Sequence, residues 1–243
     1  MSRSSTLQWP IATFVNMLTV AVGSILGLLL QSVFNEDIQG IVFQAVGLGT
    51  ILIGLKMALR LPDGYMLIFI FALILGGILG EVIGLAEWMS SLSDQLKLFV
   101  GASDSNFTEG LITAFLLFCI GSMTIVGALE EGLSKNRSLI YVKSTLDGFT
   151  AIALTASFGI GVLFSIIPML IFQGGITVLA VKLKPIFDQK TLDLVSAVGG
   201  ILIIGISINM LQLGEITLEN LLPSLLVAII FSKTYQRFKG NSK

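Results

Sequence analysis

Long runs of apolar residues, separated by short polar connections, recur from one end of the chain to the other. A helix needs about 20 consecutive apolar residues to cross the ~30 Å hydrocarbon core of a bilayer. The pattern therefore predicts an all-α polytopic transmembrane helix bundle of about eight spans, in a single integral membrane domain covering residues 1–243. The predicted spans are Ile11 to Gln31, Ile38 to Leu59, Tyr65 to Ala86, Gly110 to Leu129, Leu139 to Ser157, Ile160 to Val181, Leu192 to Leu213, and Leu218 to Lys233.

Two connections need separate comment. The fifth and sixth predicted spans are separated only by the Phe158-Gly159 turn. One kinked helix is the alternative, but about forty apolar residues are too many for a single crossing, so we expect two helices. The longest connection, Glu87 to Glu109, has an amphipathic pattern that favours a short helix lying at the membrane interface. A plain loop is the alternative there.

Composition agrees with a membrane location. Of the 243 residues, 54% are hydrophobic and 12% are charged, against roughly 25% charged in soluble domains. The first apolar stretch has no small-residue cleavage site, so we expect a retained span rather than a signal peptide. The net charge is −1 and the only basic cluster is a modest C-terminal tail, so nucleic acid is not an expected partner. The expected partner is the lipid bilayer.

The distribution of Lys and Arg predicts the orientation. In an eight-span arrangement the basic residues outside the spans divide unequally between the two sides of the membrane. Lys97 lies on one side, and all the others lie on the opposite side. These are Arg3, Arg60, Lys135, Arg137, Lys182, Lys184, Lys190, Lys233, Arg237, Lys239 and Lys243. By the positive-inside rule both termini are expected in the cytoplasm, in a multi-pass protein of the plasma (inner) membrane. Acidic residues on the opposite side, Glu109 and Glu215 among them, would make the outer mouth negative.

The second and seventh spans resemble each other. Ala45-Val46-Gly47 followed by Gly49 to Leu55 aligns, with a one-residue slip, with Ala197 to Ile206. An odd number of connections separates the two segments, so they run in opposite directions. Inverted-topology repeats of this kind occur in many secondary transporters, and we expect one relating spans 1–3 to spans 6–8. Chance similarity between helices rich in Gly and Ile is the alternative.

Four segments carry a resemblance to a known family: Asn16 to Gly27, Gln44 to Ala58, Leu117 to Met123, and Lys143 to Phe149. They resemble the bacterial membrane family called domain of unknown function 554, the YqgA-like and YdfK-like proteins, over nearly the whole chain. The sequence departs from the family pattern at Ala12, where glycine is usual, and at Ser122, where proline is usual. The resemblance implies a polytopic inner-membrane protein with a transport role.

Two charged residues lie within an otherwise apolar span. Lys143 and Asp147 are one helical turn apart, and a charge at the bilayer centre costs roughly 2.5–3.5 kcal/mol on insertion scales. At 1.5 Å per residue, Lys143 would lie roughly 7 Å into the membrane and Asp147 about 13 Å. Asp147 could bind a cation or exchange a proton, with Lys143 standing in for the cation when the site is empty. The alternative is a static, mutually neutralising pair in the less favourable i,i+4 order.

Further polar residues at membrane depth complete the expected site. Gln173 follows Pro168 in an interrupted, glycine-containing helix, where freed carbonyl groups could face a cavity. Together with Asp147 and Lys143, the residues expected to bind an ion or substrate are Asn16, Ser122, Ser144 and Gln173, with Thr124 as a further oxygen. Such an oxygen-rich cage suits a hard monovalent cation or polar solute groups. Amides that join helices, and hydroxyls bonded to their own backbone, are the alternatives.

Other chemistry has little support in the sequence. The chain has no histidine and a single cysteine, Cys119, so we expect no disulfide, no imidazole metal site and no cofactor. No span contains an Asp-x-x-Asp motif or a prominent Ser/Lys pair, and we therefore do not expect an enzyme. We assign Lys56, Glu81, Glu130 and Glu131, near span ends, to interfacial anchoring.

Glycines spaced by four residues, as in Gly23/Gly27, Gly76/Gly80 and Gly80/Gly84, allow helices to approach closely. We expect them mainly to pack helices within the chain, with some faces available for a homo-oligomer. A secondary transporter or channel for a small cation or small polar solute is the favoured function. A membrane scaffold that binds lipid or a partner without transporting anything is the alternative, because one ion pair and glycine faces would suffice for it.

Overall fold

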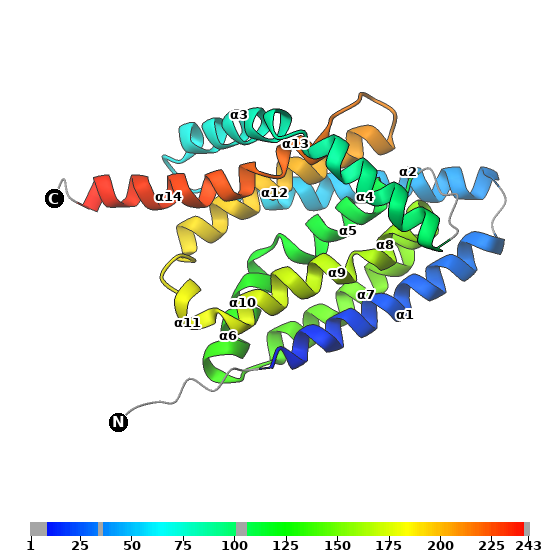
Figure 1. Ribbon diagram of the computed structural model, residues 1–243, viewed down its shortest axis with the longest axis horizontal. Helices are drawn as coiled ribbons and strands as arrows, with labels where there is room; N and C mark the ends of the chain where they lie inside the picture. The colour runs from blue at the N-terminus through cyan, green and yellow to red at the C-terminus, as the bar shows by residue number, and fades with distance from the viewer. Residues whose placement is uncertain (1–8, 34–35, 101–105, 241–243) are drawn as a thin grey trace.

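A computed structural model describes residues 9–33, 36–100 and 106–240, and these residues form helices and no strand (Figure 1). Arg3 and Lys243, used above for the orientation, lie outside the described residues. The helices are α1 (Ile11–Val33), α2 (Glu36–Ala58), α3 (Met66–Val82), α4 (Leu85–Val100), α5 (Phe107–Cys119), α6 (Ser122–Ser134), α7 (Ser138–Phe158), α8 (Gly161–Phe164), α9 (Ile166–Met169), η1 (Leu170–Gly174), α10 (Gly175–Val178), α11 (Ala180–Leu183), α12 (Gln189–Met210), α13 (Leu218–Leu221) and α14 (Ser224–Gly240). The all-α fold class is confirmed.

Helices occupy all eight of the predicted apolar stretches, but not all are unbroken. By length and composition, four helical stretches among the described residues can cross a membrane: Ile11–Gln31, Gly40–Ala58, Gly161–Val178 and Gln189–Met210. The number rises to six if each of two bent pairs is one span, α3 with the first part of α4 (57°) and α5 with α6 (58°). The eight-span count therefore stays a prediction, with α7 and α14 as the additional spans.

The chain reverses between the fifth and sixth predicted spans, so these are two separate elements. Gly159 follows α7 with a φ of 75°, in the left-handed region where a side chain would be strained. From there α8, α9 and η1 return along α1, with α8 and α9 also packed on α5, and α10 packs on α6 (Figure 1). The expected helix after Glu87 is also present, as α4, which begins just after Gly84.

Both ends of the described chain lie at the same end of the bundle. In this view α1 begins at its left-hand end, α14 ends at the far left, and the long helices run roughly along the horizontal axis (Figure 1). An even number of crossings produces this arrangement, which agrees with the expected orientation of the termini.

Close helix pairs build the bundle, and contacts at glycines give their directions. Gly23 lies against Gly148 and Gly27 against Ile152, so α1 and α7 run parallel. The helix α3 runs antiparallel to α13 and α14, because Gly76 lies against Ser224 while Gly80 lies against Asn220. These glycines pack helices within the chain, and the homo-oligomer stays a prediction.

The two similar segments of spans two and seven pack against each other. Gly54 of α2 faces Gly200 of α12, and Gly47 lies near Met210 and Leu211, so the helices are antiparallel. A Cβ atom on Gly54 would lie 2.7 Å from the Gly200 carbonyl oxygen. The two backbones therefore meet directly, which only glycine permits at this separation.

Two of the predicted spans are interrupted near the middle of the bundle. The break between α5 and α6 falls at Ile120 and Gly121, and the Thr124 hydroxyl donates to the freed carbonyl of Phe118 at 2.8 Å. On the sixth predicted span, Pro168 in α9 is followed by a π-helical turn, η1. Single π-turns inside helices are rare and are frequent at functional sites. Both interruptions border the polar cluster described below.

We predict that Gly54→Ala destabilises the protein and that Gly49→Ala does not. The added methyl at Gly54 would collide with backbone atoms of α12, an overpacking that costs about 1–3 kcal/mol. On the same helix, a Cβ at Gly49 meets nothing within 4 Å. Thermal unfolding of the purified protein in detergent would measure both. Equal midpoints for the two variants would show that α2 and α12 do not pack in this way.

Candidate functional site: a buried acid, lysine and amide cluster

Lys143 and Asp147 form an ion pair inside the bundle. They lie one turn apart on α7, and only 5% of Lys143 and 7% of Asp147 is exposed. The Lys143 Nζ atom also lies 5.8 Å from the centroid of the Phe118 ring, at the end of α5. A buried pair of this kind is strongly destabilised when one partner is removed, because the other charge is then uncompensated.

Asn16 brings α1 to this pair. Its Nδ2 atom donates one hydrogen bond to Asp147 Oδ2 at 2.9 Å and another to Gln173 Oε1 at 3.1 Å. The contact depends on the close approach of α1 and α7, where Gly148, next to Asp147, packs on Thr19. The Asn16 Oδ1 atom is buried and has no hydrogen-bond partner. The Asn16 amide thus donates to the Asp147 carboxylate, while its own oxygen stays without a partner.

Gln173 is fully buried within the π-helical turn η1. Its Nε2 atom donates to Thr13 Oγ1 at 3.2 Å, and its backbone carbonyl accepts from the Thr177 hydroxyl at 3.2 Å. The structure therefore brings together Lys143, Asp147, Asn16 and Gln173 from three separate spans.

The polar contacts continue from Gln173 toward one end of the bundle. Glu131, near the end of α6, has no exposed surface and accepts from the backbone N–H of Ala12 and from Arg137 Nε, both at 2.9 Å. The Thr177 hydroxyl lies 3.5 Å from its other carboxylate oxygen. Arg137 is 29% exposed. A connected series of polar groups thus leads from Asp147 to a partly exposed arginine.

Glu131 corrects the sequence analysis, which assigned it to interfacial anchoring. A carboxylate near a span end usually reaches the interface, but here α6 is only 13 residues long and its end packs under α1 and α10. The only sequence signal was a basic residue, Arg137, in the short connection that follows this helix. Its neighbour Glu130 accepts from Asn136 in an exposed contact, as expected for an anchor.

Two predicted oxygen ligands do not join the cluster. The Ser144 hydroxyl donates to the Ile140 carbonyl of its own helix at 2.8 Å, the usual alternative for serine in a membrane helix. Thr124 is occupied at the α5 break. Ser122 begins α6, but its side chain lies outside the described part of the structure.

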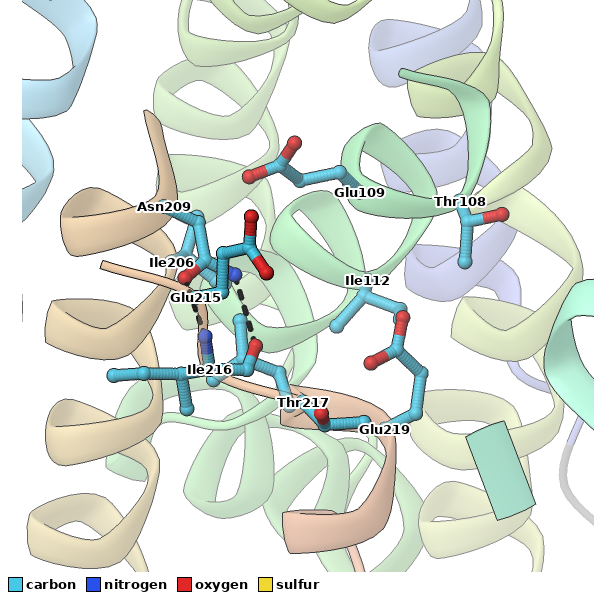
Figure 2. A pocket seen from close by; sticks show the side chains of 10 residues that line it. Thr108, Glu109, Ile112, Ile206, Asn209, Glu215, Ile216, Thr217 and Glu219 are labelled. Atoms are coloured by element: carbon cyan, nitrogen blue, oxygen red, sulfur yellow. Dashed lines mark hydrogen bonds between the residues drawn. The ribbon is translucent and has the colours of Figure 1, made fainter. Parts of the chain in front are cut away.

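A cavity of about 320 Å³ lies at the opposite end of the bundle from Arg137, where α5 begins and α12 ends. Figure 2 shows the carboxylates of Glu109, Glu215 and Glu219 gathered around it. Asn209 fixes the adjoining loop by donating to the Ile216 carbonyl at 2.9 Å and accepting from its N–H at 2.8 Å. Among the described residues, no acidic cluster is arranged to hold a metal ion. We call this cavity the acidic vestibule. Glu109 and Glu215, which the sequence analysis places on the same side of the membrane, both line it.

The sequence of the chain is similar to that of known proteins over most of its length. The model of the family described as "Protein of unknown function (DUF554)" matches residues 11–233. The chain belongs to this family. It is 33% identical over 217 residues to the Bacillus subtilis (strain 168) "Uncharacterized membrane protein YdfK", covering 88% of this chain and 92% of that protein. It is 28% identical over 230 residues to the Escherichia coli (strain K12) "Uncharacterized protein YqgA", covering 93% and 97%.

No solved structure matches the chain. The family match includes the segments that carry Asn16, Lys143, Asp147 and Gln173. Membership and the apolar helices together establish this DUF554 member as a membrane protein.

We predict that Glu131→Ala lowers the free energy of unfolding by about 2 kcal/mol, because hydrogen bonds to a buried charge contribute about 1.5–3 kcal/mol. The change leaves the Ala12 N–H without its acceptor and Arg137 without its partner. Glu130→Ala is the matched control and should have little effect. Thermal unfolding in detergent measures both, and equal stability of the two variants would contradict the structural role of Glu131.

Proposed function

We propose that this protein is a secondary transporter or channel for a small cation or small polar solute, rather than an enzyme. The observation that carries the proposal is the cluster of Asp147, Lys143, Asn16 and Gln173 beside two interrupted helices. Ionisable residues at membrane depth are costly and mark ion or solute pathways in many membrane proteins. Interrupted helices supply unpaired backbone groups at the same depth.

The cluster has the parts of an exchangeable cation site. Asp147 supplies negative charge, and Lys143 neutralises it while no cation is bound. A cation that displaces Lys143 from the carboxylate would meet the unpaired Oδ1 atom of Asn16 nearby. Such competition between a fixed and a mobile cation would avoid an uncompensated buried charge in either state. The acidic vestibule at the other end would raise the local concentration of cations.

The helix pairing supports a repeat of spans 1–3 in spans 6–8. Under that repeat α2 corresponds to α12, and α3 corresponds to α14 with α13. The two members of each pair pack against each other and run antiparallel. A pseudo-two-fold axis in the membrane plane relates helices that run in opposite directions. Asn16 and Gln173, on the first and sixth spans, meet in the same way. Alternating access in transporters commonly uses such paired halves.

One observation favours the scaffold alternative. Asp147 is 7% exposed and its charge is already paired with Lys143, which is the arrangement expected of a static structural pair. The two functions differ in what happens when the carboxylate is neutralised. A scaffold needs only the fold, whereas a transporter needs the exchangeable charge.

We predict that Asp147→Asn, combined with Lys143→Met so that no buried charge is left uncompensated, abolishes cation flux while the protein stays folded. Asparagine keeps the shape and can accept from Asn16, but it cannot attract a cation. The measurement is collapse of imposed Na⁺, K⁺ or H⁺ gradients in reconstituted vesicles, read by ion-sensitive dyes. Asp193→Asn on α12 is the control, because Asp193 accepts only an exposed hydrogen bond from Gln189. Wild-type flux in vesicles with the double variant would remove Asp147 from the mechanism.

We further propose that both termini lie in the cytoplasm of a bacterium, with the protein in its inner membrane. The positive-inside distribution and the common position of the α1 and α14 ends support this. We predict that a reporter active only in the cytoplasm is active when fused to either terminus. Activity at one terminus alone would mean an odd number of crossings, and the eight-span count would be wrong.

A further inference from the structure

Buried hydroxyls in this bundle differ in their hydrogen-bond partners. Several donate to a carbonyl of their own helix four residues earlier, as Ser144, Thr177 and Ser207 do. Another group has no hydrogen-bond partner and no exposed surface. It consists of Ser24, Thr113, Thr155 and Ser165. A buried hydroxyl without a partner is destabilising and requires an explanation.

Three of these hydroxyls lie at one level in the bundle. Gly110 of α5 packs where α7 meets α8, with a Cβ position 2.7 Å from Phe158 Cβ and 3.4 Å from Val162 Cγ2. Three positions from each of these residues is a residue whose buried hydroxyl has no hydrogen-bond partner. They are Thr113 on α5, Thr155 on α7 and Ser165 after α8. Residues three apart share a helix face, so these three residues lie on helix faces that pack together around Gly110.

Ser24 joins them from α1. A Cβ on Gly27 would lie 2.7 Å from Thr155 Cβ, and Ser24 lies one turn before Gly27 on the same face. The helix α1 also contacts α8 and α9, on either side of Ser165. Four spans that pack together therefore each carry one fully buried, unpartnered hydroxyl in this part of the bundle, and we call these four residues the hydroxyl ring.

The hydroxyl ring lies between the acidic vestibule and the buried cluster. Glu109, which lines the vestibule, is one turn before Thr113 on α5. Asp147 is two turns before Thr155 on α7, with the fully buried Ala151 between them. A solute moving from the vestibule to Asp147 would therefore meet the hydroxyl ring on its way.

The chemistry of the ring selects one class of ligand. Its groups are uncharged oxygens, which replace the hydration shell of a monovalent cation, whereas protein sites for divalent cations usually include carboxylates. Carboxylates lie on both sides of the ring, at Glu109 and at Asp147, and they disfavour an anion. We propose that Ser24, Thr113, Thr155 and Ser165 coordinate a dehydrated monovalent cation of the size of Na⁺. This inference rests on the proposed function for its place on the path.

Cation-dependent stability of the purified full-length protein tests the ring without relying on transport. NaCl replaces choline chloride at constant ionic strength, and the unfolding temperature is recorded at each Na⁺ concentration. A bound ion raises that temperature in a saturable way. Thr155→Val and Thr113→Val remove one oxygen each at nearly constant volume. We expect the half-saturating Na⁺ concentration to rise about tenfold or more in each, as for loss of one ligand.

Thr150→Val is the matched control on the same helix, because the Thr150 hydroxyl donates to the Leu146 carbonyl at 2.9 Å. It should keep the wild-type Na⁺ dependence. Two results would overturn the proposal. In the first, both ring variants keep the Na⁺ dependence of the wild type. In the second, both ring variants unfold at a higher temperature than the wild type, and Na⁺ stabilises none of the proteins. The second would mean that valine merely relieves unpaired hydroxyls.

The outcome also separates this inference from the proposed function. Saturable Na⁺ stabilisation that depends on Thr155 and Thr113, in a protein that shows no flux, would keep the cation site and reject transport. Flux that depends on Asp147 but is unaffected by the ring substitutions, with no Na⁺ stabilisation, would keep transport and reject the ring.

Discussion

The buried ion pair between Lys143 and Asp147 sets the main constraint on this structure. Hydrocarbon cannot solvate either charge, so each must find its partners within the protein. Asn16 provides one of them from α1, and Gln173 holds Asn16 from the returning sixth span. Three spans are thereby fixed around one carboxylate. Breaking any of these contacts would leave a polar group unpaired in a medium without water.

Close helix packing and two helix interruptions bring the spans together around this ion pair. Parallel packing of α1 on α7 requires glycine at the contacts, because Gly23 and Gly27 meet backbone atoms of α7 directly. The α5–α6 break brings Phe118 over the lysine, while the π-turn places Gln173 opposite Asn16. Close helix packing and helix interruption are both costly in isolation. Here both occur around the same buried cluster, and the proposed pathway would use this irregular backbone.

Much of this could be predicted from sequence because it depends on local pattern. Apolar length located the helices, and a charge within an apolar run identified Asp147 and Lys143. Features that depend on tertiary contacts could not be predicted. Glu131 resembles any acid near a span end, and only the packing of α1 on α6 shows that it is buried. Likewise, sequence does not distinguish Ser144, which bonds its own helix, from Ser24, which has no partner.

The proposed transport function requires that the polar interior beside α1 opens to water, although Ser24 has no exposed surface in this structure. Single cysteines introduced in a Cys119→Ala background test it directly, since charged thiosulfonate reagents modify thiolates and these form only in contact with water. Membrane vesicles would carry either Ser24→Cys or Leu18→Cys, the latter 64% exposed on the outer face of α1. The account predicts modification of the first and not of the second. An unreactive cysteine at position 24 would contradict it.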